Sequence, residues 1–221
     1  MYYGNAGTII MDGFSLLLMG GMLFYTSLYR KRGRRDDRLF CGMIVVDMIY
    51  AGVELITYAQ EGASISFLRT LMIVENTVVY AALVLFPYLF MLYTDFRCFR
   101  DEQRYKRVSV LYGIPCMAWF AILVINLWTG WIFTINESCQ FIDGQIDQIV
   151  FIPIVFYILC TLLRVRRIDI RLVFLGILLA ASRMLWDLWY MPIEATSFMY
   201  ALYLVLAHIH VMNQPLAEER L

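Results

Sequence analysis

Charged and amide side chains lie inside stretches of this sequence that are otherwise almost wholly apolar. An ionisable group at membrane depth costs a few kcal/mol, so such residues indicate a functional site when they occur in a membrane protein. Carboxylates and guanidinium groups placed there bind ions, polar ligands or one another. Three stretches carry the residues concerned, which are Asp47 and Glu54, then Arg69, Glu75 and Asn76, and finally Arg183 and Asp187.

The spacing of these residues places them on shared helical faces. Asp47 and Glu54 are seven residues apart, as are Arg69 and Asn76, so each pair occupies one face of a helix. We therefore predict one polar pocket, open to the outside, built from three helices. Its ligand-binding residues are predicted to be Glu54, Arg69, Glu75, Asn76, Arg183 and Asp187, with secondary contributions from Asp47, Tyr80 and Trp186.

The charge balance of this set favours a ligand. It contains four acids but only two arginines, so two carboxylates would be protonated or would bind a cation or polar ligand. A purely structural role is the alternative: Arg183 would pair with Asp187 or Glu75, Arg69 would reach the headgroups, and Asn76 would bond across helices. The residues alone leave both interpretations open.

The composition identifies the elements that must position these side chains as membrane helices. Of 221 residues, 62% are apolar and 16% are charged, whereas soluble domains average ~45–50% and ~25%. An apolar stretch of about 20 residues crosses the hydrocarbon core. We predict an all-α fold with seven transmembrane helices, at about Gly13–Tyr29, Leu39–Gln60, Arg69–Tyr93, Val108–Trp128, Ile149–Leu163, Leu172–Tyr190 and Ala195–Asn213.

The basic residues predict the orientation of these helices. Residues 30–38 hold six, residues 97–107 hold five and residues 164–171 hold four, all in alternate connections. The positive-inside rule assigns these connections to the cytoplasm. We therefore expect the N-terminus outside, a transmembrane domain over residues 1–213, a cytoplasmic tail over residues 214–221, and a place in the plasma membrane. The longest outer connection would be 129–148.

Several classes of function lack positive evidence in the sequence. The five cysteines show no CxxC or CxxH spacing, and His208 and His210 are two residues apart on different helical faces, so we expect no metal site. No GxSxG, HExxH or glycine-rich phosphate loop is present. We expect no catalytic residues, no enzymatic activity and no cofactor. The basic connections are short and also acidic, which favours contact with membrane lipids over nucleic acid.

Three stretches resemble one family of membrane sensors. They are ENTVVYAALVLFPYLFMLY at 75–93, TGWIFTINE at 129–137 and ALYLVLAHIHVMNQ at 201–214, together 42 of the 221 residues. They are similar to the N-terminal seven-helix sensor regions that precede GGDEF (diguanylate cyclase) or histidine-kinase modules in clostridia-like Gram-positive bacteria. FIDG at 141–144 stands where that group has Tyr-x-Arg-Gly, and no catalytic residue of an output module is present.

The resemblance implies a sensor whose output module is attached in cis or supplied in trans. We therefore predict a receptor for a small extracellular or intramembrane ligand or ion that signals through the cytoplasmic end of the seventh helix. The expected partners are membrane lipids, the ligand and the output module, with a homodimer left open. The alternative is a small-solute or ion-coupled transporter that uses the same carboxylates, although a carrier more often shows internal repeats and broken helices.

Overall fold

The structure, a computed structural model, describes residues 2–29, 35–60, 66–164 and 196–213. The helices in these residues are α1 (Tyr2–Tyr29), α2 (Arg35–Gln60), α3 (Ser66–Phe99), α4 (Glu102–Thr129), α5 (Phe151–Arg164) and α7 (Thr196–Asn213). A short antiparallel hairpin, β1 (Phe133–Ile135) and β2 (Phe141–Asp143), and a 3-10 helix, η1 (Asp147–Val150), connect α4 to α5.

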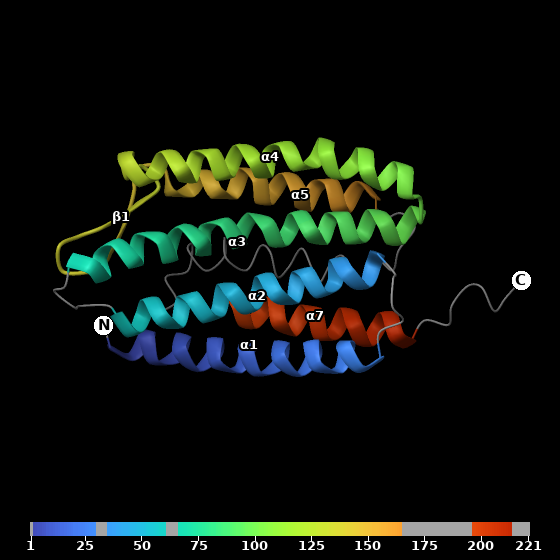
Figure 1. The fold of residues 1–221 in the computed structure, drawn as a ribbon, viewed down its shortest axis with the longest axis horizontal. Helices are drawn as coiled ribbons and strands as arrows, with labels where there is room; N and C mark the ends of the chain where they lie inside the picture. The colour runs from blue at the N-terminus through green and yellow to red at the C-terminus, as the bar shows by residue number, and fades with distance from the viewer. Residues whose placement is uncertain (1, 30–34, 61–65, 165–195, 214–221) are drawn as a thin grey trace, which may run out of the picture.

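The helices lie side by side along one long axis, with α3 at the centre of the arrangement (Figure 1). α3 packs against α2 on one side and against α4 and α5 on the other, and α1 packs against α2 and α7. The β1–β2 hairpin lies at the same end as the N-terminus of α3, which we call the hairpin end (Figure 1). The turn between α3 and α4 lies at the opposite end, which we call the charged end.

Local sequence explains where α3 and α4 end. Arg100 adopts a left-handed φ of 49°, which stops α3. The Asp101 carboxylate then accepts hydrogen bonds from the backbone N–H groups of Gln103 (2.8 Å) and Arg104 (3.1 Å), which caps the N-terminus of α4. At the other end of α4, Gly130 has a φ of 64° and donates its N–H to Asn126 O. The two caps fix the length of α4 and aim the chain into the hairpin.

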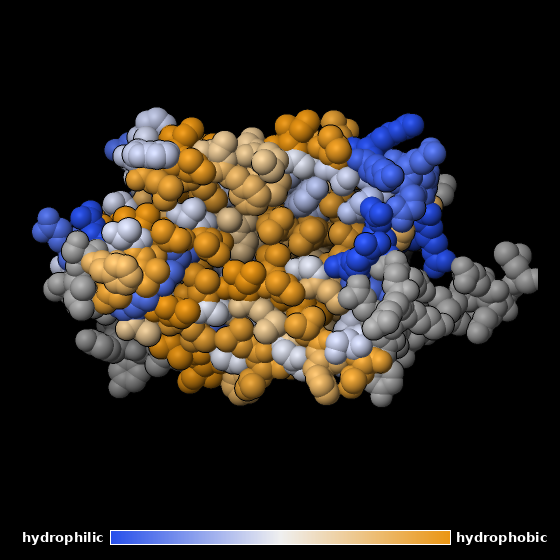
Figure 2. All heavy atoms as spheres, viewed as in Figure 1, coloured by the Kyte–Doolittle hydropathy of each residue, from blue (hydrophilic) through white to orange (hydrophobic). Residues whose placement is uncertain are grey.

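The helical bundle has the properties of a membrane protein. Four of the described helices are long and apolar enough to cross a membrane. Their candidate membrane-spanning parts are Gly7–Leu28, Arg35–Gln60, Phe67–Phe99 and Glu102–Thr129. Large apolar side chains such as Leu17 (75% exposed) and Val110 (73% exposed) cover the sides of the bundle. Figure 2 shows these apolar sides, with hydrophilic residues gathered at the ends. The prediction of a mainly helical membrane protein is confirmed at this level.

The predicted spans differ from the helices mainly at their ends. α1, α2, α3 and α4 each extend further than predicted. In α2, α3 and α4 the added turns contain charged residues, such as Asp36, Arg97 and Glu102, that continue the helix beyond the apolar run. The connection at 129–148, for which the sequence predicted no secondary structure, contains the hairpin, whose three-residue strands are too short to show an alternating pattern. The predicted fifth span is α5, and the predicted sixth span, Leu172–Tyr190, lies outside the described residues.

Candidate functional site

Glu75 forms the centre of a polar cluster between α2 and α3 near the hairpin end. Its side chain is only 8% exposed. Gln60 Nε2 donates a hydrogen bond of 3.0 Å to Glu75 Oε1, and Thr57 Oγ1 lies 3.2 Å from Glu75 Oε2. Among the described residues Glu75 has no ion-pair partner. Two neutral donors from α2 therefore hold a buried carboxylate of α3 by both of its oxygens.

Glu54 and Asp47 lie on the same helix as Thr57 and Gln60, further from the hairpin end. Glu54 is 8% exposed and one helical turn from Thr57. Asp47 is 1% exposed and accepts a hydrogen bond of 3.4 Å from Ser15 Oγ of α1. Along α2, Thr57 and Gln60 therefore contact Glu75 of α3, whereas Asp47 contacts Ser15 of α1.

Arg69 and Asn76 have different partners from those that the sequence suggested. Arg69 is exposed, and its Nε donates a hydrogen bond of 2.9 Å to Ile135 O of β1. No carboxylate of the described part of the chain pairs with it. Asn76 is 8% exposed and its Nδ2 donates to Met72 O (2.8 Å) within α3, so this bond does not cross helices. Arg69 consequently anchors the hairpin to α3.

Tyr80 belongs to an aromatic cluster that fixes the hairpin over α3 and α4. Its ring stacks on Phe133 at 5.3 Å between centroids and on Phe141 at 6.5 Å, and the two phenylalanine rings are 5.8 Å apart. Offset stacks of this kind stabilise by about 0.5–1.5 kcal/mol beyond the area they bury. Trp119 of α4 donates its Nε1–H to Tyr80 O at 2.9 Å. The Tyr80 ring therefore packs the hairpin against α3.

Asn126 joins α4 to the hairpin through both the oxygen and the nitrogen of its side-chain amide. Its Oδ1 accepts a hydrogen bond of 2.7 Å from Ile132 N, and its Nδ2 donates one of 3.2 Å to Phe133 O. The side chain is 4% exposed. Sequence reasoning missed this residue, although an asparagine four residues before a Thr-Gly helix end was visible as a candidate for capping the turn.

Replacing Asn126 with alanine is expected to destabilise the fold by about 2 kcal/mol, because Ile132 N and Phe133 O each lose a buried partner. Unfolding in detergent micelles measures the loss. Thr129→Ala on the same helix removes only an exposed hydroxyl bonded to Ile125 O, so it should change stability by less than ~0.5 kcal/mol. Equal losses for the two variants would contradict this role of Asn126.

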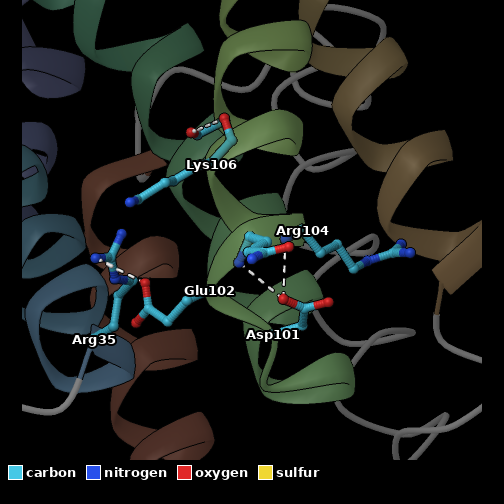
Figure 3. A network of polar contacts seen from close by, with 7 residues as sticks. Arg35, Asp101, Glu102, Arg104 and Lys106 are labelled. Carbon is cyan, nitrogen blue, oxygen red and sulfur yellow. Dashed lines mark hydrogen bonds and ion pairs between the residues drawn. The ribbon is translucent and has the colours of Figure 1, made fainter.

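The charged end contains ion pairs that join α2, α3 and α4. Arg35 Nη2 lies 2.9 Å from Glu102 Oε2 and Arg97 Nη1 lies 3.2 Å from Asp36 Oδ2. Arg104 Nη2 lies 3.1 Å from Asp95 Oδ1. Figure 3 shows Arg35 directed toward Glu102, beside the Asp101 cap of α4. These pairs hold three helices at one end, opposite the Glu75 cluster.

The remaining predicted site residues, Arg183, Trp186 and Asp187, lie outside the described residues. Within the described ranges, no group of three or more histidine, cysteine or acidic side chains could hold a metal ion. Sequence reasoning missed Thr57 and Gln60, the donors to Glu75, although Thr57 follows Glu54 by three residues and Gln60 follows Thr57 by three. It also did not single out Asp12 and Ser15 of the first span, whose shared helical face is given only by their spacing of three residues.

The site therefore consists of a buried carboxylate between α2 and α3, next to a hairpin that is anchored on α3 and α4. Comparison of the chain with protein-family models, with curated proteins and with solved structures finds no match.

Proposed function

We propose that this protein is a receptor in the plasma membrane that binds a small cationic or donor-rich ligand at the Glu75 cluster. One observation carries the proposal: Glu75 is 8% exposed, and its described partners are neutral donors and not a cation. Gln60 donates to one oxygen, whereas the single hydroxyl proton of Thr57 is divided between Glu75 Oε2 (3.2 Å) and Val53 O (3.0 Å). A buried carboxylate gains more from a charged donor than from a neutral one, because charge-assisted hydrogen bonds are roughly twice as strong. A cation that displaced Thr57 or Gln60 would therefore bind favourably.

Binding at this place would alter how α2 and α3 pack. Thr57 and Gln60 both reach Glu75 from α2, so releasing them loosens one helix from the other at the hairpin end. A ligand shifts a conformational equilibrium only by its difference in affinity for the two states. The contact of α1 and α2 with α7 supplies a route from such a change to α7, the proposed output helix.

The remaining parts of the proposal follow from the sequence. The basic residues of the charged end place it in the cytoplasm under the positive-inside rule, with the N-terminus and hairpin outside and seven spans in all. The receptor would have no enzymatic activity and would signal through an output module in cis or in trans, as in the clostridia-like sensor regions that it resembles. A homodimer fits this arrangement, and nucleic acid is not a partner.

Thermal unfolding of the protein in lipid nanodiscs tests the proposal with ethanolamine, putrescine and choline as probes. We expect at least one probe to raise the melting temperature saturably, and Glu75→Gln to weaken its affinity at least tenfold. Glu137→Gln is the matched control, because Glu137 is an exposed acid on the hairpin. No shift with any probe, or an equal shift in Glu75→Gln, would overturn the Glu75 site.

Flux measurements separate the receptor from the transporter. Proteoliposomes that receive the same labelled probe in the outer solution should show saturable binding of the probe without its uptake into the vesicles. Uptake that depends on Glu75 would instead establish a carrier and reject the receptor.

A further inference from the structure

A second polar cluster lies in the interior of the bundle, between α1 and α2. Asp12 is the only charged residue of α1 and is 0% exposed. Thr8 (2% exposed) and Ser15 (0% exposed) lie four residues before it and three residues after it, on the same helical face. An otherwise apolar helix thus buries three oxygen-bearing side chains in one row.

Asp47 of α2 faces this row from about the middle of its helix. It is 1% exposed, and Ser15 Oγ donates to its Oδ2 over 3.4 Å. Asp12 lies close enough for its charge to act on Asp47. Within the part of the chain that the structure describes, Asp47 Oδ1 is buried and has no hydrogen-bond partner. Asp47 Oδ1 therefore lies among polar side chains without a described hydrogen-bond donor.

A buried oxygen of this kind is costly unless a positive charge or a donor satisfies it. Asp12 has further interactions of its own, so the open oxygen of Asp47 is the ligand that the site offers. Hard cations take carboxylate and hydroxyl oxygens as ligands, and calcium needs six to eight of them. Because Asp12 has other interactions, the site offers one open carboxylate oxygen, Asp47 Oδ1, with the hydroxyls of Thr8 and Ser15 in the row of α1 that faces it. That is fewer than six oxygens and a single available negative charge, which suits a monovalent cation better than calcium.

We propose that Asp47, with Ser15 and Asp12, holds a sodium ion between α1 and α2. The site is separate from the Glu75 cluster, since Asp47 contacts α1 and Glu75 contacts the α2 side chains Thr57 and Gln60. The sodium ion joins α1 to α2 in addition to the hydrogen bond between Ser15 and Asp47. It stabilises the folded state by mass action and does not depend on the receptor function proposed above.

Thermal unfolding of the full chain in detergent, at fixed pH and ionic strength, tests the site with sodium chloride, potassium chloride and N-methylglucamine chloride. We expect sodium alone to raise the melting temperature, by about 3 °C at ten times its dissociation constant. Asp47→Asn should abolish the rise and Ser15→Ala should reduce it. Asp37→Asn, at the charged end of the same helix, and Glu75→Gln should both retain it.

Two results would overturn the sodium site. The first is an equal effect of all three salts on the unmodified protein, which would mean that a proton or another part of the chain satisfies Asp47. The second is a sodium effect that persists in Asp47→Asn. If Asp47→Asn does not fold, the comparison of the three salts with the unmodified protein and with Ser15→Ala decides the question. Because the readout is stability, either failure leaves the Glu75 proposal standing.

Discussion

Replacing Gly144 with alanine is expected to detach the hairpin and to destabilise the protein by about 3 kcal/mol. A Cβ at this position would lie 2.0 Å from Trp131 O and 2.6 Å from Ile132 C. Both atoms belong to the backbone, so no side-chain rotation relieves the clash. Gly144 N also donates to Ile132 O (2.8 Å) and Ile146 N to Trp131 O (3.0 Å), and both bonds require the close approach that alanine prevents.

Two measurements check the prediction for Gly144. Unfolding in detergent gives the loss of stability, and limited proteolysis between residues 130 and 146 reports whether the hairpin has detached. Gly21→Ala in α1 is the matched control, because a Cβ there meets nothing within 4 Å, and alanine in a helix is favoured over glycine by about 0.5–1 kcal/mol. A Gly144→Ala protein as stable and as protease-resistant as Gly21→Ala would show that the hairpin is not held by this contact.

The sequence predicted the membrane helices and the polar residues inside them, because both leave local patterns. Runs of apolar residues determine where α1 to α4 lie, and the seven-residue spacing of Asp47 and Glu54 correctly places them on one face of α2. That both are buried agrees with the cost of exposing a carboxylate to lipid. The position of a residue along and around its own helix is therefore readable without a structure.

The partners that a residue contacts on other helices or strands cannot be predicted from local sequence patterns. Arg69 bonds to Ile135, which is 66 residues away, and a three-residue strand gives no pattern that would indicate a bond acceptor there. Asp47 contacts α1 although it shares a stripe with Glu54, because a buried helix has neighbours on several sides. A shared helical face therefore does not by itself imply a shared neighbour. Whether the acids and arginines form one pocket stays a prediction, because Arg183 and Asp187 lie outside the described residues.

The pair between Arg104 and Asp95 is expected to contribute far more to stability than the pair between Arg35 and Glu102. Arg104 holds Asp95 through two atoms, Nη2 to Oδ1 at 3.1 Å and Nε to Oδ2 at 3.3 Å. The Asp95 side chain is 1% exposed, whereas that of Glu102 is 54% exposed. Removing one partner of a buried pair costs about 3–5 kcal/mol, whereas exposed pairs contribute ~0–1 kcal/mol.

Arg104→Gln should therefore lower the free energy of unfolding by about 3 kcal/mol, toward the lower end of that range because the Arg104 side chain is 38% exposed. Glu102→Gln, two residues before Arg104 on α4, should lower the free energy of unfolding by less than ~1 kcal/mol. The double variant Asp95→Asn/Arg104→Gln should lose less than the sum of its single variants, by at least ~1 kcal/mol, since it leaves no charge without its partner. Additive losses would mean that Arg104 acts through its stacking on Phe99, whose ring centroid lies 3.6 Å from the guanidinium carbon, and not through Asp95.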